Sequence, residues 1–381
     1  MSVVIVGGGL MGLSAAFHLR RTDPTVPVTV LERAGVGAAA SGASAAGVRA
    51  MGRDPAERAL ALASLRRWPD LHLELEADLH YHRGGGLRLA LDEPAWRAAG
   101  GWVADQRAHG VPVEVVDAAT ARRLAPGITP ESPGGAWCPI DGHAEAMTTV
   151  QAFANAARRL GARIEEGIGA RALVTERGRV SAVERTDGTR EPCDAAIVTA
   201  GTWSASLLTP LGVRLPLETR ALQMLLTAPA PKALAPVLGG FERKLSLKQL
   251  DDGAYLIGGG WPARITDDAG NRYEVLDDSV KASLEGARLI YPPVGSCELA
   301  RRWAGLEAFT PDGLPVIGPL PDVKGLFVAA GFSGHGFALS PAVGDVLARV
   351  ALRRDALDTL WSGLRFDRPA LAPAAVGLSP R

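Results

Sequence analysis

Three glycines near the start of the chain, Gly7, Gly9 and Gly12, match the spacing G-x-G-x-x-G. The first glycine allows a sharp turn, the second lets the backbone approach a pyrophosphate, and the third lets a helix pack closely on a sheet. The free N–H groups at the start of that helix would then face the phosphates. Glu32 follows Gly12 by about 20 residues, the separation at which an acidic side chain accepts hydrogen bonds from an adenosine ribose. These four residues predict a dinucleotide-binding site.

A strand, a helix and a second strand would position these residues. The β-branched run from Val3 to Val6 predicts a strand that is buried on both faces. Apolar residues recur at helical spacing from Leu13 to Leu19, and a second strand from Val26 to Leu31 leads into Glu32. A glycine triplet alone is compatible with an ordinary turn. The order of strand, glycines, helix, strand and acid favours the nucleotide site.

A stretch of small residues, 35–47, follows the second predicted strand. A flexible linker is one interpretation of this composition. The stretch lies between a strand of the nucleotide fold and a strongly predicted helix, which favours a second interpretation. In this interpretation Ser41, Ser44 and nearby backbone N–H groups contact the pyrophosphate. Arg49 comes directly after the stretch. The pair Asp54-Pro55 then has the residue types of a helix N-cap and first helical position.

A second glycine-rich turn, from Gly331 to Phe337, lies near the other end of the chain. It follows a predicted strand, Gly325 to Ala330, and precedes a predicted helix, Pro341 to Leu352. One nucleotide needs one diphosphate loop, so a second close approach of backbone indicates a further group such as a flat ring, which favours a flavin over NAD. The strand from Ala195 to Thr199 also ends on small residues, Ala200-Gly201, at the carboxyl end where α/β sheets bind ligands.

The composition is that of a globular protein with a large core. The 381 residues are 47% hydrophobic and 22% charged, and two domains are expected at this length. The 41 basic and 41 acidic residues balance, which gives no argument for nucleic acid or an anionic membrane surface as a partner, and we expect neither nucleic acid binding nor a membrane span. No signal peptide precedes the first strand, and no apolar run has the roughly 18 residues that span a bilayer. We therefore expect a cytoplasmic protein without a membrane span.

Cysteine and histidine usage does not predict a metal site. The three cysteines, Cys138, Cys193 and Cys297, lie far apart and indicate buried or free thiols in a reducing compartment. His80 and His82 alternate on a predicted strand, but no third ligand is in register with them. We expect no bound metal.

Several stretches of the chain together resemble one protein family. They are VVIVGGGLMGLSAAFHL with LER, SGASAAGVR, AIVTAGTWS, RRWAGLEAFTPDGLPVIG and GFSGHGFALSPAVG, and they span most of the chain. The combination is similar to the FAD-dependent D-amino-acid oxidase, sarcosine oxidase and glycine oxidase superfamily. The closest likeness is to the sarcosine oxidase β-subunit-like branch, which includes flavin subunits of hydroxyproline, proline and opine dehydrogenases. The resemblance implies FAD as the cofactor and an amino acid as the substrate.

The expected fold is α/β (α+β), with an FAD-binding Rossmann-like domain and a discontinuous second domain built on a mainly antiparallel sheet. Alternating segments at 216–226, 245–249 and 254–260 predict that sheet. The expected division is an FAD-binding domain at 1–80, 144–215 and 300–370, a substrate domain at 81–143 and 216–299, and a C-terminal tail at 371–381.

The resemblance also implies which positions hold FAD. The first glycine turn would hold the diphosphate, the acid after the second strand would hold the ribose, and the later segments would approach the flavin. No cysteine stands near Ala304-Gly305, where members with covalent flavin have one, so FAD is expected to be non-covalent. The implied cofactor-binding residues are Gly7, Gly9, Leu10, Met11, Gly12, Glu32, Arg33, Ser41, Ser44, Ala45, Gly47, Leu173, Ala200, Gly201, Trp203, Gly331, Ser333, Gly334, His335, Gly336 and Phe337.

Three departures from the family bear on the substrate and the electron acceptor. Ala338 stands where monomeric sarcosine oxidase has a substrate-binding lysine, and Leu256 stands near the place of its oxygen-activating lysine. The second departure favours a dehydrogenase, although glycine oxidase also lacks that lysine. Glu307 follows a Gly-Leu pair where glycine oxidase and D-amino-acid oxidase have an arginine that binds the substrate carboxylate. Its charge is the wrong one for that task.

Arg49 and His335 are the predicted catalytic-site residues. Arg49 stands where sarcosine oxidases have a carboxylate-binding arginine, and a surface arginine at a helix entry is the alternative interpretation. Arg220 and Arg302 are weaker candidates for the same role. His335 lies inside the second glycine turn, where it is expected to form a hydrogen bond near the flavin.

The expected reaction is oxidation of the C–N bond of a small secondary or N-alkyl amino acid, such as proline, hydroxyproline, sarcosine or an opine. Hydride transfer from Cα to flavin N5 would give an imine, and the protein would orient the substrate. Two alternatives stay open: a flavoprotein subunit of a hetero-oligomeric dehydrogenase that passes electrons to partner subunits, and a glycine or D-amino-acid oxidase. The zero net charge disfavours a tRNA-modifying FAD domain.

Overall fold

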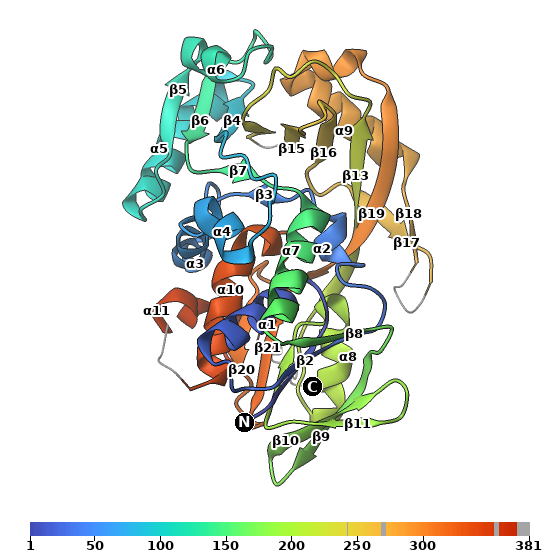
Figure 1. Cartoon of the computed structure of the whole chain (residues 1–381). Helices are drawn as coiled ribbons and strands as arrows, with labels where there is room; N and C mark the ends of the chain where they lie inside the picture. The colour runs from blue at the N-terminus through green and yellow to red at the C-terminus, as the bar shows by residue number, and fades with distance from the viewer. Residues whose placement is uncertain (242, 268–271, 354–357, 372–381) are drawn as a thin grey trace, which may run out of the picture.

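The computed structural model describes residues 1–241, 243–267, 272–353 and 358–371. Two large sheets dominate the structure, and Figure 1 shows them one above the other with helices packed against each. The predicted tail at 371–381 lies outside the described residues except for Leu371. No helix of the described chain combines the length and the apolar composition that crossing a membrane requires.

The lower sheet in Figure 1 has six strands and is parallel except at one edge, where β20 runs antiparallel to β21. Its strand order is β20 (Val316–Pro319), β21 (Leu326–Ala330), β12 (Ala195–Val198), β1 (Val3–Val6), β2 (Val28–Glu32) and β8 (Arg163–Glu166). The predicted strand from Val3 to Val6 is therefore confirmed, and it lies at the centre of a mainly parallel sheet.

Both faces of this sheet are covered, which explains its continuous apolar strands. Val3 and Ile5 share a core with α1 (Leu10–Thr22), α7 (Ala146–Arg159) and α10 (Gly336–Ala351). Val4 and Val6 share the opposite core with α8 (Ser204–Leu208) and with β9 (Ala170–Glu176) and β10 (Arg179–Arg185), which form a small sheet with β11 (Arg190–Pro192). Alternate residues of β1 thus fill different cores.

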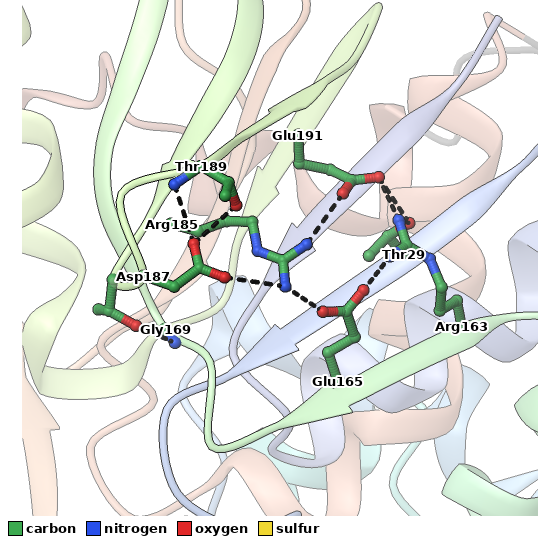
Figure 2. A network of polar contacts seen from close by, with 9 residues as sticks. Thr29, Arg163, Glu165, Gly169, Arg185, Asp187, Thr189 and Glu191 are labelled. Atoms are coloured by element: carbon green, nitrogen blue, oxygen red, sulfur yellow. Dashed lines mark hydrogen bonds and ion pairs between the residues drawn. The ribbon is translucent and has the colours of Figure 1, made fainter.

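Charged side chains join the small sheet to the edge of the six-stranded sheet (Figure 2). At the centre of the network, the Arg185 guanidinium contacts carboxylates of β8, of the β10–β11 turn and of β11, and its side chain is only 15% exposed. This partial burial reduces the screening that makes exposed ion pairs weak. The network therefore holds the small sheet against β2, the strand that ends in Glu32. Its members are Thr29, Arg163, Glu165, Arg185, Asp187 and Glu191.

The upper sheet in Figure 1 has ten strands and is mainly antiparallel, which confirms the predicted fold class. Its strand order is β18 (Tyr273–Glu274), β17 (Pro262–Ile265), β13 (Glu218–Thr227), β16 (Tyr255–Gly258), β15 (Arg243–Gln249), β14 (Val237–Gly240), β4 (Gly86–Ala90), β6 (Gly134–Cys138) and β5 (Glu114–Asp117), and β19 (Leu299–Phe309) pairs with β13. The helices α5 (Glu93–Ala108), α6 (Ala118–Leu124) and α9 (Asp277–Ile290) lie in this upper part.

The small-residue stretch at 35–47 is packed between the two sheets and is not a flexible linker. It contains the short helix α2 (Ala40–Ala43) and leads into β3 (Gly47–Val48), which pairs with β7 (Gly142–His143). The Trp303 indole N–H of β19 donates to Ala43 O at 3.2 Å, and a Cβ on Gly305 would lie 2.4 Å from Ala43 Cβ. Larger residues would not fit this close approach, which accounts for the composition.

One predicted domain boundary divides a continuous strand. The prediction assigns 300–370 to the FAD-binding domain, but β19 runs along β13 in the large sheet from Leu299 to Phe309. Its far end then reaches the second glycine turn, because the Ser333 N–H donates to Ala308 O at 3.0 Å. Because β19 is one continuous strand, its sequence has no turn that would mark where the chain leaves the large sheet and approaches the second glycine turn. We move this boundary to the end of β19 and keep the rest of the division as a proposal.

The helix after the second glycine turn starts earlier than predicted. α10 begins at Gly336 and contains Pro341, whereas the prediction takes this proline as the helix start. Proline has no N–H for the carbonyl four residues before it, which is Phe337 O. The Ser340 hydroxyl donates to that carbonyl instead, at 3.0 Å. The lost backbone bond is thereby replaced, and the helix continues through the proline.

Candidate active site

The first glycine turn links β1 to α1 and has no room for a side chain at two positions. Gly7 has a φ of +111°, and a Cβ there would lie 2.5 Å from Thr199 O. A Cβ on Gly12 would lie 2.0 Å from Gly7 O. Gly9 is the N-cap of α1, so the turn leads directly into the helix N-terminus. This tight cradle of backbone N–H groups fits the diphosphate of the FAD that the sequence implies.

Ser41 and Glu32 lie beside this turn. The Leu10 N–H donates to Ser41 Oγ at 3.0 Å, and the Gly8 N–H donates to Glu32 Oε2 at 2.7 Å. Met11 extends from the same first turn of α1 to within 3.1 Å of the place that a Cβ on Gly336 would take. The N-termini of α1 and α10 therefore converge, although their glycine turns are far apart in the chain.

Arg33 and Trp203 lie together beyond the carboxyl ends of β2 and β12. The Arg33 guanidinium carbon is 3.6 Å from the centroid of a Trp203 ring, which is a cation–π contact. Ala200 and Gly201 join β12 to Trp203, and Ala200 lies beside the first glycine turn. Leu173 is separate from this group, because its side chain is buried in the core under the small sheet. Its predicted contact with the cofactor could involve only the backbone of β9.

The second half of the small-residue stretch lies against the large sheet. Ser44 Oγ accepts a hydrogen bond from the Ala46 N–H at 2.9 Å, and Ala46 has a φ of +52°. Ala45 O accepts a hydrogen bond from Lys248 Nζ of β15. Gly47 then pairs with β7. These contacts bring Ser44, Ala45 and Gly47 to the wall of a cavity between the sheets.

The second glycine turn reaches the same cavity from the other side. Gly331, Ser333 and Gly334 have φ values of +72°, +51° and +84°, all in the left-handed region, and they reverse the chain between β21 and α10. Ser333, Gly334, His335 and Phe337 line the cavity, and the Phe337 ring stacks on Trp68 at a centroid distance of 5.3 Å. The two predicted groups of flavin-side residues therefore meet around one space.

The cavity has a volume of about 860 Å³ and is bounded above by β13, β15, β17 and β19 of the large sheet. This volume is in the range of ligand-binding clefts. Small residues from the stretch at 35–47 and from the second glycine turn leave room for a flat ring on one side. The cradle of the first glycine turn and this cavity together fit FAD and a small substrate.

Arg49 enters the cavity at the end of β3. The buried Asp141 carboxylate fixes the backbone that follows, because the Ala50 N–H donates to Asp141 Oδ1 at 2.7 Å. Arg49 forms no ion pair with any described carboxylate. Arg220, by contrast, donates two hydrogen bonds of 2.7 Å to Glu218, and Arg302 pairs with Asp277. Of the three arginines considered from sequence, Arg49 has the guanidinium available to a ligand.

His335 lies against a buried acid that the sequence prediction missed. His335 Nδ1 is 3.1 Å from Glu57 Oε2, and Arg53 Nη1 is 4.0 Å from the same oxygen. Burial lowers the pKa of His335, and the charge of Arg53 lowers it further. Burial alone would raise the pKa of Glu57, but contacts with His335 and Arg53 outweigh it and lower that pKa. Glu57 follows Asp54 by three residues and therefore resembles an ordinary helix-capping acid in the sequence.

Glu307 is the acidic side chain at the cavity wall, on β19. Burial raises the pKa of Glu307 to about 7, although backbone N–H groups of Gly334 and Ala308 favour its ionised form. Arg220 lies opposite Glu307 in the β13–β19 ladder, but its guanidinium is bound to Glu218. Sequence comparison marked Glu307 only as a departure from the family. The structure makes it a carboxyl that can exchange a proton near neutral pH.

Lys248 is a second residue that sequence reasoning missed. It is fully buried on β15, and burial, with the nearby charge of Arg49, lowers the pKa of Lys248 to about 7. It pairs in register with Leu256 of β16. Leu256 stands near the place of the oxygen-activating lysine of monomeric sarcosine oxidase. The Lys248 amine therefore belongs to the residue beside that place on the neighbouring strand. In sequence, Lys248 alternates with leucines and resembles a solvent-facing strand residue.

The two histidines with alternating spacing share a carboxylate outside this cavity. His80 Nδ1 and His82 Nε2 each lie 2.9 Å from an oxygen of Asp251. The described part of the chain contains no group of three His, Cys, Asp or Glu side chains arranged to hold a metal ion. The two histidines are contacts of the Asp251 carboxylate.

Comparisons with known proteins show the family of this chain. A family model described as FAD dependent oxidoreductase (DAO) matches residues 2–350. A glycine oxidase from Pseudomonas putida is 29% identical over 348 residues, which cover 89% of this chain and 91% of that protein. A D-amino acid dehydrogenase from Rhizobium johnstonii is 31% identical over 313 residues, which cover 79% of this chain and 73% of that protein.

Among solved structures, L-proline dehydrogenase from P. horikoshii shares the fold, with a TM-score of 0.87 at 24% identity over 94% of this chain and 95% of that one. The family model covers most of the sequence, including both glycine turns and β19. The chain therefore belongs to the DAO family of FAD-dependent oxidoreductases and is an FAD-dependent amino acid oxidoreductase.

Proposed function

We propose that this chain oxidises the C–N bond of a small secondary or N-alkyl amino acid. One observation carries the proposal: an arginine that forms no ion pair with a described carboxylate, Arg49, and a carboxyl of raised pKa, Glu307, line the same cavity. These two groups match the carboxylate and the amine of an amino acid. The secondary-amine class is supported by the motifs shared with proline and sarcosine enzymes and by the likeness in fold to L-proline dehydrogenase.

In this proposal Arg49 binds the substrate carboxylate. A guanidinium and a carboxylate form charge-assisted, bidentate hydrogen bonds, which fix orientation as well as add affinity. Asp141 holds the backbone beside Arg49 and so positions its side chain. Held by its carboxylate, the substrate would have its Cα fixed in the space beside the second glycine turn, where orientation lowers the barrier to reaction.

Glu307 would accept the proton of the substrate ammonium. An amino acid nitrogen is protonated in neutral water, and a protonated nitrogen has no lone pair with which to form the C=N bond. The Glu307 carboxylate, ionised above about pH 7, can remove this proton after binding. FAD, when bound, supplies the acceptor for the hydride that leaves Cα. Water would then hydrolyse the imine.

The pH dependence of the reaction tests this role. In the wild-type protein, kcat/KM should rise with pH and level off above about 7, because Glu307 becomes ionised there. Glu307→Gln should lower kcat/KM at pH 7.5 by about a hundredfold, since a positioned base contributes about 10² or more to the rate. It should also abolish the rise of kcat/KM with pH (the rising limb of the profile). The measurement is kcat/KM for one substrate between pH 6 and 8.5.

Lys248 provides the matched comparison, because its pKa also lies at about 7. Lys248→Met should keep the rising limb if Glu307 causes it. A limb that persists in Glu307→Gln and disappears in Lys248→Met would assign the ionisation to the lysine and refute the role of Glu307.

The substrate class is tested by anaerobic bleaching of the purified yellow protein. We expect proline, hydroxyproline, sarcosine or an opine-type N-carboxyalkyl amino acid to bleach it at least tenfold faster than glycine or D-alanine. Admitting air afterwards separates an oxidase, which recolours quickly, from a dehydrogenase. Bleaching by glycine or D-alanine alone would contradict the secondary-amine class. Bleaching by dithionite but by no amino acid would contradict the proposal and favour a partner-dependent subunit.

A further inference from the structure

The active-site cavity has more positive charge than a simple amino acid needs. Among the described residues, six cationic side chains line it together with one carboxyl, Glu307. Two of the six have acidic partners: Arg220 is bound to Glu218, and Arg53 lies 4.0 Å from Glu57. The cationic residues are Arg49, Arg53, Arg88, Arg220, Arg243 and Lys244.

Arg88, like Arg49, is an arginine of the cavity whose guanidinium forms no ion pair with a described carboxylate. It lies on β4 between Leu87 and Leu89, whose side chains fill the core on the other face of the sheet, so Arg88 points to the cavity. Its Nε–H donates to Gly240 O at 3.1 Å, and its guanidinium carbon lies 5.5 Å and 5.6 Å from the ring centroids of Trp102 and Phe241. These contacts fix the side chain but leave its charge without a carboxylate among the described residues.

Arg88 and Arg49 are neighbours that come from different parts of the fold. Both line a small side cavity of about 20 Å³ in addition to the main one. Burial lowers the pKa of Arg88 to about 10, and the charge of Arg49 also lowers it. The charge of Arg49 also lowers the pKa of His335 and the pKa of Glu57. Arg49 is therefore near both the His335–Glu57 pair and Arg88.

Two adjacent guanidinium groups without a bound anion repel each other and have lost hydration, so an anion that binds both removes an unfavourable interaction. Bound FAD does not supply this anion, because its diphosphate belongs at the first glycine turn. A substrate with one carboxylate satisfies Arg49 alone. A substrate with a second carboxylate a few bonds away satisfies both arginines, while its amine remains available to Glu307.

We propose that Arg49 and Arg88 bind the two carboxylates of a dicarboxylic amino acid, which is the substrate class of this enzyme. The inference rests on the proposed function, because it assumes that the amine of the same molecule is oxidised. The second carboxylate is carried either on the nitrogen, as in an N-carboxyalkyl amino acid, or on the side chain, as in aspartate or glutamate. The first position agrees with the secondary-amine class, whereas the second would keep the oxidation of the C–N bond and replace that class by a primary amine. Arg243, at the exposed rim beside Gly240, extends the positive wall next to Arg88.

Binding of non-reacting acids tests the second site without turnover. We would titrate the FAD-loaded protein with glutarate and with butyrate, which differ in one carboxylate, and follow the flavin absorption spectrum. Glutarate should bind at least tenfold more tightly, because a charge-assisted hydrogen bond to arginine contributes that much or more. Equal dissociation constants would overturn the inference.

Substitution locates the second carboxylate. Arg88→Gln should reduce the preference for glutarate to within about twofold and leave butyrate binding unchanged, and Arg88→Lys should restore part of it. Arg302→Gln, which removes one ion-paired charge from the same sheet outside the cavity, is the matched control and should keep the full preference. Equal weakening of both acids by Arg88→Gln, or loss of the preference in Arg302→Gln, would contradict the assignment.

Two matched substrate pairs then connect binding to catalysis. Sarcosine and N-(carboxymethyl)glycine differ by a carboxylate on the nitrogen substituent, and alanine and aspartate differ by one on the side chain. The pair with the larger gain in kcat/KM, expected to be at least tenfold, identifies where the second carboxylate is carried. Oxidation of amino acids without any gain would refute this inference and leave the proposed function standing. Tight glutarate binding without oxidation of any amino acid would refute the proposed function, and with it the substrate class, and would leave only a binding site for two carboxylates.

Discussion

Arg49→Gln is expected to raise KM for the amino acid substrate at least tenfold. Charge-assisted hydrogen bonds contribute about 1.5–3 kcal/mol, and Arg49 has no described carboxylate that takes part of this energy in the free protein. The FAD content should not change, because Arg49 lies outside the glycine turn that cradles the diphosphate. Steady-state kinetics and the ratio of flavin to protein absorbance measure the two effects.

The competing arginines serve as controls for this prediction. Arg220→Gln changes an arginine of the same cavity that is already bound to Glu218, and Arg302→Gln changes one that is paired with Asp277. Each should change KM by less than about threefold. An unchanged KM in Arg49→Gln, together with a large increase in either control, would remove Arg49 from the carboxylate site.

Gly12→Ala is expected to reduce FAD binding by at least a hundredfold. A Cβ at this position would lie 2.0 Å from Gly7 O and 2.7 Å from Thr199 Oγ1, and both neighbours are held in place. The Gly7 carbonyl belongs to the turn that leads into α1, and the Thr199 hydroxyl donates to Val6 O at 3.0 Å. Relief of the overlap must move the α1 N-terminus away from the turn, which separates the N–H groups that bind the diphosphate.

The readout for Gly12→Ala is the flavin content after purification and after addition of excess FAD. Gly286→Ala, within α9, is the matched control, because a Cβ there meets nothing within 4 Å. That change should leave the FAD content at the wild-type level and stabilise the helix by about 0.5–1 kcal/mol. A yellow Gly12→Ala protein with wild-type affinity would show that the turn tolerates the displacement and would contradict the proposed cradle.

Features that depend on short-range physics could be predicted from the sequence. The run Val3 to Val6, the three glycines and the acid at Glu32 lie in one contiguous strand–turn–helix–strand segment, so their residue types and spacing can be followed along the chain. Asp54 is another example: its side chain accepts a hydrogen bond from the Ala56 N–H at 2.9 Å, and Pro55 opens α3 (Pro55–Leu65) as predicted. The family motifs extended this information to the fold class and to FAD.

Charged groups on the cavity side of the large sheet could not be predicted in the same way. Lys248 and Arg88 each alternate with leucines, a pattern that is typical of a strand with one solvated face. Which face is solvated depends on what packs against the sheet. In this protein the stretch at 35–47 contacts Lys248, and the rings of Trp102 and Phe241 lie beside Arg88. The hydrogen bond from Lys248 to Ala45 O joins residues 203 positions apart, a separation about which local pattern carries no information.

The sequence by itself therefore determined the nucleotide-binding turn, the family, the cofactor and the mainly antiparallel second sheet, because each depends on local spacing or on a run of matched motifs. Only the tertiary structure decided that Arg49, Arg88 and Glu307 share one cavity and that Arg220 and Arg302 have other partners. The physical reason is that a charge acquires its role from desolvation and from its nearest opposite charge. Both are set by chain segments that meet only after folding.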